Sequence, residues 1–218
     1  RIPNFAELKA WGKQHITFGV KGFMSGVMME LNTRVDILML GYFSSDAVVG
    51  IYSFAAICAE GFFQLLIILR NNYNPILVKL LAEKKLPELT AIIIKGKRTT
   101  YLLMAGIGSA AILGYFIVIP LVTTDPHLAQ SWIFFSILVA GITLSAGYQP
   151  FSQILLQAGL PGWHTTMMLG VVLFNALANL ALIQIWGAAG AALATAGAFI
   201  FTILLLQQFC SRLVGIRL

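Results

Sequence analysis

The side chains best suited to chemistry in this sequence are ionisable residues that lie close together in an otherwise apolar stretch. They are Lys21, Glu30, Arg34 and Asp36. If residues 15–43 form one helix, a rotation of about 100° per residue places five polar residues on one stripe: Thr17, Lys21, Ser25, Asn32 and Asp36. Glu30 and Arg34 are four residues apart on nearly the opposite side, where they can pair. Because hydrocarbon cannot solvate polar groups, we expect the stripe to face other helices or a water-filled cavity.

Two readings of this stripe stay open. In the functional reading it lines a central cavity, where Lys21, Arg34 and Asn32 contact an anionic substrate. In the structural reading Lys21 extends to the membrane surface, while Arg34 and Asp36 take part in internal ion pairs that hold the bundle together.

A second polar face falls on residues 46–70 and contains Glu60 and Gln64. A carboxylate in the middle of a span needs a nearby cation or a bound proton. Glu60 is therefore either a proton or cation coupling site, together with Asp36 and Gln64, or the structural partner of Arg34 or Lys21.

Neutral residues further along the chain are candidates for helix packing or gating. Asn175 and Asn179 are four residues apart, which suits hydrogen bonding between helices. Pro150 removes a backbone hydrogen bond and should kink its helix. Small residues after Gly187 suit close contact between helices.

Composition requires a membrane around these residues. No Asp, Glu, Lys or Arg occurs between Asp125 and Arg212, and the chain is 59% hydrophobic and only 10% charged, with a mean hydropathy of +0.87. A soluble domain has about 25% charged residues. The sequence therefore predicts an integral membrane protein.

Hydropathy predicts an all-α bundle of six transmembrane helices in a lobe of residues 15–211. The spans are expected at about 15–43, 46–70, 98–123, 129–157, 164–185 and 187–210. A polar lead-in covers 1–14, and a tail covers 212–218. The runs are continuous rather than alternating, which argues against a barrel. Since the chain opens on Arg1 with no signal peptide, we expect it to be part of a longer protein.

The distribution of Lys and Arg predicts the orientation. With six spans, all the basic segments outside the spans fall on one face, so both ends should be cytoplasmic. A basic amphipathic helix, expected at about 74–86, begins at Asn74-Pro75 and should lie on that surface. The positive charge of this helix is explained by its position on the cytoplasmic face. The alternative explanation is a specific binding site for anionic lipids.

Other classes of function lack support. Cys58 and Cys210 have no motif spacing, and the histidines have no acidic cluster near them in sequence. There is no nucleophile–base pair, metal-ligand spacing or phosphate-binding glycine loop. We therefore expect no metal, no cofactor and no enzymatic activity, and the membrane explains the net charge of +6 better than nucleic acid does.

Two stretches resemble the C-terminal half of the polysaccharide, or oligosaccharide-lipid, flippases. Residues 31–52 read LNTRVDILMLGYFSSDAVVGIY, a polar helix with an internal Asp, a short turn and then Val-Gly-hydrophobic-Tyr. Residues 147–198 hold a helix with Pro150, the turn Gly159-Leu160-Pro161, a helix with Asn175 and Asn179, and a Gly-Ala-rich entry to the last helix. The individual motifs are common, whereas their order and spacing are more specific.

The resemblance implies a member of the multidrug/oligosaccharidyl-lipid/polysaccharide (MOP) exporter superfamily, whose members have two six-helix lobes around a central cavity. This chain would be the C-terminal lobe, with a similar N-terminal lobe elsewhere in the protein. The implied function is alternating-access translocation of an undecaprenyl-diphosphate-linked oligosaccharide across the cytoplasmic membrane for O-antigen, capsule or exopolysaccharide assembly. Membrane lipids, a polysaccharide polymerase and glycosyltransferases are the candidate partners. The alternatives are a cation-coupled multidrug exporter of the same superfamily and a non-transporting scaffold of a glycan-assembly complex.

Overall fold

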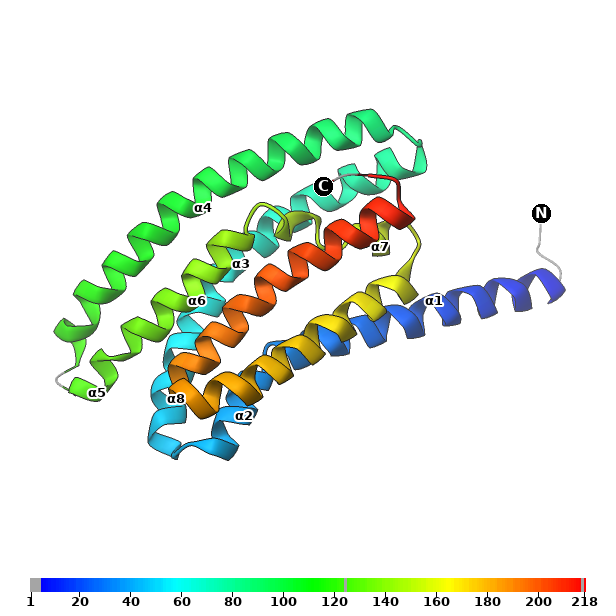
Figure 1. Cartoon of the computed structure of the whole chain (residues 1–218). Helices are drawn as coiled ribbons and strands as arrows, with labels where there is room; N and C mark the ends of the chain where they lie inside the picture. Colours follow the sequence, from blue (N-terminus) through cyan, green and yellow to red (C-terminus); the bar gives the residue numbers. More distant parts are fainter. Residues whose placement is uncertain (1–4, 124, 217) are drawn as a thin grey trace.

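The computed structural model describes residues 5–123, 125–216 and 218, which form an elongated bundle of helices (Figure 1). Within these residues there is no strand, in agreement with the expected all-α fold. Residues 1–4 of the predicted lead-in lie outside the described residues. The element order is α1 to α6, a 3₁₀ turn η1, α7 and α8.

The first predicted span consists of two helices, α1 (Phe5–Asn32) and α2 (Val35–Phe43). The carbonyl oxygen of Asn32 accepts a hydrogen bond from the Asn175 side chain, and the Thr33 hydroxyl donates to the Glu30 carbonyl at 2.8 Å. These side-chain bonds compete with helical ones and accompany the break. The prediction of one polar stripe with Lys21 and Asp36 assumed a single continuous helix. Because the helix is broken between these two residues, the prediction does not hold across residues 33 and 34.

Helix α3 (Asp46–Ala82) is longer than its predicted span and continues through Pro75. The expectation of a separate amphipathic helix at 74–86, beginning at Asn74-Pro75, is wrong. Buried Leu66 and Leu77 are eleven residues apart, which is three helical turns, so the buried face keeps its register on both sides of the proline. Packing of that face explains why the helix does not end there.

Helix α4 (Leu86–Val122) follows a turn at residues 83–85. Most of the predicted basic connection between spans two and three is therefore helical. Within the turn, Lys84 has a φ of 55° and the Lys85 ammonium lies 2.8 Å from the Glu83 carboxylate. The hydrogen bond from Lys85 lowers the pKa of the Glu83 carboxyl from its ordinary value.

The fourth predicted span is broken. It contains α5 (Pro126–Ala129), α6 (Ser131–Ser145), η1 (Gln149–Phe151) and α7 (Ile154–Gln157), and the chain bends by 60° between α6 and residues 149–157. Pro150 lies in η1 and is buried. At the bend, the Tyr101 ring occupies the space beside Gly147, where a Cβ atom would approach it to 2.2 Å.

Helix α8 (Pro161–Leu213) is a helical hairpin, because its backbone reverses at Gly187, where φ is 55° and ψ is −132° (Figure 1). Pairs such as Phe174 and Phe201, whose rings stack at 4.4 Å, join the two arms. At Gly190 a Cβ atom would lie 2.0 Å from the Leu182 carbonyl oxygen. The turn needs a glycine for its positive φ, and the close approach of the arms needs another.

Among the described residues, three helices are long and apolar enough to cross a membrane: α3, α4 and α8. The bent pair of α6 and residues 149–157 is a fourth candidate if it counts as one span. Helix α1 is not among these candidates, so the predicted count of six transmembrane helices is not confirmed. What the structure supports is an all-helical bundle with several membrane-length apolar segments.

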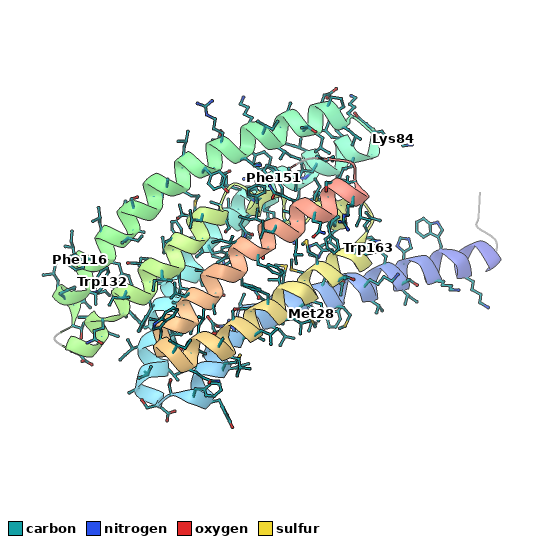
Figure 2. The ribbon with its side chains drawn as sticks, in the orientation of Figure 1. Met28, Lys84, Phe116, Trp132, Phe151 and Trp163 are labelled. Atoms are coloured by element: carbon teal, nitrogen blue, oxygen red, sulfur yellow. The ribbon has the colours of Figure 1, made fainter. Side chains whose placement is uncertain are left out.

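Figure 1 shows that α1 begins and α8 ends at the same end of the bundle, where α3 also turns into α4. The turns from α2 to α3 and at Gly187 lie at the opposite end. Lys84, labelled in Figure 2, lies at the end that holds both termini of the described chain. The basic segments thus share one end of the bundle, as the orientation argument requires; their side of the membrane stays a prediction.

Candidate functional site

The carboxylate of Asp36 lies inside the bundle just after the α1–α2 break, with only 4% of the residue exposed. It accepts hydrogen bonds from the Tyr52 hydroxyl at 2.5 Å, from the Ile37 backbone N–H at 2.9 Å and from the Thr195 hydroxyl at 3.1 Å. These donors come from α3, α2 and the second arm of α8. One carboxylate therefore joins three separate segments of the lobe.

A chain of side-chain amides reaches the same break from α8. The Asn175 amide nitrogen donates to both the backbone and the side-chain oxygen of Asn32 at 3.1 Å. The Asn179 amide nitrogen donates to the backbone and side-chain oxygens of Asn175 at 2.9 Å. The side-chain oxygen of Asn179 is buried and has no hydrogen-bond partner among the described residues. The interior thus contains a carboxylate and an unused amide acceptor, with polar contacts that connect α1, α2, α3 and α8.

Asn32 takes part in this network as the acceptor of both bonds from Asn175, and its contact with a substrate stays a prediction. Arg34 lies outside the network, since its exposed guanidinium pairs with Glu30 at 3.6 Å. The alternative in which Arg34 pairs with Asp36 is wrong, because the partners of Asp36 are hydroxyl and amide groups. Neutral hydrogen-bond donors, rather than a cation, surround the carboxylate.

Glu60 is half-buried and Gln64 is exposed, both on α3. No hydrogen bond or ion pair joins Glu60 to another residue in the described part of the chain. The structural alternative that paired Glu60 with Arg34 or Lys21 is therefore wrong. Its coupling role stays a hypothesis.

Lys21 lies beside the start of α8. Its carbonyl oxygen accepts a hydrogen bond from the Thr165 hydroxyl at 2.7 Å, and its side chain passes over Gly162, where a Cβ atom would touch its Cδ at 3.5 Å. One turn further along α1, buried Ser25 is hydrogen-bonded to Nδ1 of buried His164. These contacts fix the register between α1 and α8, and Figure 2 shows Trp163 next to this junction.

An open groove of about 860 Å³ runs between α1 and the first turn of α8. Its walls include Lys13, Thr17 and Lys21, which follow one another at intervals of four residues on α1. Trp163 and Thr166 face them from α8. Of the predicted polar stripe, only Thr17 and Lys21 lie in this groove, whereas Ser25, Asn32 and Asp36 pack inside the lobe.

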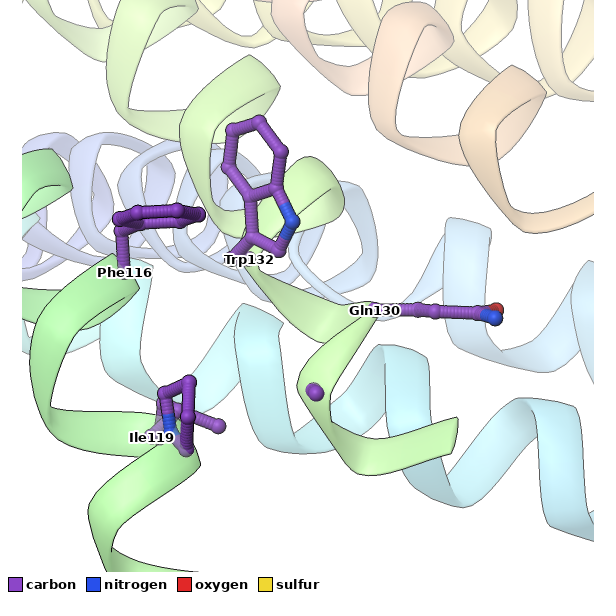
Figure 3. A pocket seen from close by; sticks show the side chains of 6 residues that line it. Phe116, Ile119, Gln130 and Trp132 are labelled. Carbon is purple, nitrogen blue, oxygen red and sulfur yellow. The ribbon is translucent and has the colours of Figure 1, made fainter. Parts of the chain in front are cut away.

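A second pocket, of about 180 Å³, lies at the other end of the bundle between α4 and the start of α6 (Figure 3). Phe116 and Trp132 form its walls, with their rings edge to face at 5.4 Å. Ile119, Pro120 and Ala129 add apolar surface and Gln130 adds an amide, so the lining contains no ionisable side chain. It offers packing surface but no group for acid–base chemistry or charge recognition.

Several residues of the site were not singled out from the sequence. Tyr52 lies in the motif of residues 31–52, but no local pattern indicates that Tyr52, Thr195 or His164 bonds to a polar group on another helix. Their partners are 16, 159 and 139 residues away in the sequence. The four-residue spacing of Lys13, Thr17 and Lys21 is visible in the sequence and is the signal that could have indicated this groove.

The described residues contain no group of three His, Cys, Asp or Glu side chains that could hold a metal ion. No protein-family model matches the chain, and a search of curated proteins found no match. A comparison with solved structures found a MOP superfamily transporter from Pyrococcus furiosus, with a TM-score of 0.75 and 13% sequence identity. That transporter is described as having a binding pocket of reversed polarity that suggests a different function. The alignment covers 94% of this chain and 46% of the transporter, so the chain spans about half its length.

Proposed function

We propose that this chain, which has the fold of one half of a MOP superfamily transporter, is a lobe of a flippase for an undecaprenyl-diphosphate-linked oligosaccharide. The parent protein would move this lipid from the cytoplasmic to the outer leaflet of the cytoplasmic membrane by alternating access, for cell-surface polysaccharide assembly. A second lobe completes the cavity, and both ends of this chain face the cytoplasm. The fold, the membrane-length apolar helices and the motif order in residues 31–52 and 147–198 support this proposal.

The observation that carries the proposal is the network around Asp36. A change in the protonation or ion binding of this carboxylate alters bonds to Tyr52 and Thr195 and thereby acts on α2, α3 and α8 together. Coupling of ion binding to a change of access needs an ionisable group whose ligand favours one conformation over the other, and an intramembrane carboxylate bonded to several helices suits that role. Glu60, half-buried and without a bonded partner in the described chain, is the second candidate for this role, with Gln64 one turn away.

The choice of an anionic substrate rests on the flippase resemblance and on positive charge. Lys21 makes no ion pair with a described residue and is free to attract the diphosphate. Arg34 is exposed and only partly neutralised by Glu30 at 3.6 Å, so it contributes less. Asn175 and Asn179 position α8 against the break, and the bend at Pro150 is a site where the fourth span can flex.

A cation-coupled multidrug exporter is the second candidate. The same Asp36 network favours it, because a buried carboxylate without a basic partner among the described residues suits a proton or Na⁺. A membrane scaffold that moves nothing is the third.

The test replaces Asp36 by Asn in the full-length protein and measures surface polysaccharide and dye resistance in a deletion strain. For a flippase, Asp36→Asn and Lys21→Gln reduce polysaccharide export at least tenfold at normal protein level, whereas the exposed control Glu30→Gln leaves export intact. Loss of dye resistance with intact polysaccharide would instead identify the multidrug exporter. If all single variants of Lys21, Arg34, Asp36 and Glu60 show normal polysaccharide export and normal dye resistance, both transport functions are refuted and the non-transporting scaffold is the remaining candidate.

A further inference from the structure

The groove between α1 and the start of α8 contains Lys21, which the transport proposal uses, and further groups that it does not use. Lys13, Thr17 and Lys21 recur every four residues on α1, so their side chains lie above one another on a single face. All three residues are exposed. Thr165 and His164 hold α1 against α8 at this level, which makes the groove a fixed feature of the lobe.

The groove concentrates positive charge. Neither Lys13 nor Lys21 makes an ion pair with a described residue, and the lining contains no carboxylate. Two cations that line one open groove without a counter-charge in its lining favour an anion there.

The opposite wall supports the same ligand. Helix α8 begins at Pro161, and its cap residue Leu160 makes no side-chain cap, so the backbone N–H groups of Gly162 and Trp163 lack helical acceptors. The Thr166 hydroxyl also faces the groove. These donors add to the lysines, which remain the main source of attraction.

The remaining walls are apolar and aromatic, which points to a lipid rather than a free ion. Phe18 and Trp163 line the groove with 46% and 49% of their surfaces exposed. Tryptophan is enriched where a membrane meets water, and lysines near such a level attract anionic headgroups. The groove also lies at the end of the bundle that holds the other basic segments (Figure 2).

We infer that this groove binds the phosphate group of an anionic membrane lipid, held by Lys13 and Lys21 and by donors at the start of α8. The ligand is a lipid-borne phosphate, whether the phosphodiester of a resident phospholipid or the diphosphate of a lipid carrier. The site does not depend on which substrate the transporter moves, because a resident phospholipid would occupy it in either case. It differs from the helix at 74–86 that the sequence suggested for lipid contact.

The test uses the full-length protein in neutral detergent and measures binding of phosphatidylglycerol by native mass spectrometry and by thermal stabilisation. The groove variant is Lys13→Gln with Lys21→Gln, and the matched control is Lys79→Gln with Lys95→Gln, which removes two exposed lysines outside the groove. We expect the apparent Kd for phosphatidylglycerol to rise about fivefold per groove lysine, or about 25-fold for both. The control variant keeps the wild-type Kd within about twofold.

Three further probes identify the source of the phosphate. Phosphatidylcholine should bind weakly and without dependence on the groove lysines. If undecaprenyl diphosphate binds, depends on the groove lysines and is displaced by phosphatidylglycerol, the two lipids share this site. If it depends on the groove lysines but phosphatidylglycerol does not displace it, the natural ligand is the carrier lipid. Inorganic phosphate that binds as tightly as the lipids would overturn the lipid assignment.

Equal loss of binding in the groove and control variants would overturn the site, since it would show only a general attraction to positive charge. Unchanged binding in the groove variant would overturn it as well. The melting temperature without added lipid should match that of the wild type in both variants, because all four side chains are exposed. Normal polysaccharide export in a strain that lacks the protein, together with groove-dependent binding of phosphatidylglycerol, would refute the flippase and leave this site unaffected.

Discussion

The hydrogen bond from Tyr52 to Asp36 offers the sharpest test of the interior network. Replacing Tyr52 by Phe removes one hydroxyl and keeps the ring that packs beside Phe134 at a centroid distance of 6.0 Å. Tyr52 has no exposed surface and Asp36 is 4% exposed, so water cannot replace the lost donor without entering the bundle. The carboxylate would retain only Thr195 and its neighbouring backbone N–H.

Hydrogen bonds to charged groups contribute about 1.5 to 3 kcal/mol, and bonds between neutral groups about 0.5 to 1.5 kcal/mol. The chain contains a matched neutral pair, because the Tyr115 hydroxyl lies 2.8 Å from the Ser131 hydroxyl and Tyr115 is 9% exposed. We therefore expect Tyr52→Phe to lower the free energy of unfolding by about 2 kcal/mol, and Tyr115→Phe by about 1 kcal/mol.

The assay is reversible denaturation of the full-length protein in mixed micelles, followed by circular dichroism, with both variants and the wild type measured in parallel. Combining Tyr52→Phe with Asp36→Asn should give a loss smaller than the sum of the single losses, because both changes remove the same bond. If Tyr52→Phe destabilises no more than Tyr115→Phe, and if its effect adds fully to that of Asp36→Asn, the bond to a buried carboxylate is not a main contributor to stability and the reasoning fails.

Two further predictions follow from the hairpin and from the turn at residues 83–85. Gly190→Val should prevent normal folding, because its Cβ would lie 2.0 Å from the Leu182 carbonyl oxygen; Gly61→Ala, where nothing lies within 4 Å, should be neutral or stabilise by about 0.5 to 1 kcal/mol. Retention of protein yield in Gly190→Val would contradict this packing. The pKa of the Glu83 carboxyl is lowered by Lys85, so NMR titration should find it below the ordinary value and find it raised again in Lys85→Gln. The stabilising effect of this pair is present above the ordinary carboxyl pKa and is lost as the pH falls through the lowered one; an unchanged titration in Lys85→Gln would argue against the pair.

The sequence was sufficient to predict the all-α fold, because the need to satisfy backbone hydrogen bonds in an apolar stretch depends on that stretch itself and not on its distant partners. A stretch from Asp125 to Arg212 without Asp, Glu, Lys or Arg can fold only where its backbone groups are satisfied within helices. The reversal at Gly187 and the pairing of Glu30 with Arg34 were also accessible, since each depends on residues at most a few positions apart. The order of motifs in residues 31–52 and 147–198 indicated the flippase resemblance, and the structural comparison supports its fold.

The sequence misjudged the course of two helices, for reasons that lie in tertiary packing. A helical wheel assumes a continuous helix, but Asn175 on α8 bonds the Asn32 carbonyl where α1 ends and thereby alters the position of Asp36 relative to Lys21. Pro75 predicted a helix start, but buried contacts on both sides keep α3 in register through it. In both cases a partner distant in sequence outweighs the local preference.

What the sequence alone determined is which residues are rare and therefore informative: a few charged and amide side chains in an apolar chain. Only the tertiary structure decided their partners, because Tyr52 and Thr195 approach Asp36, and His164 approaches Ser25, after α1, α3 and both arms of α8 have packed together. Hydrophobic pattern and charge placement depend on neighbouring residues and the solvent, whereas a hydrogen-bonded site depends on distances of about 3 Å between groups that only folding brings together.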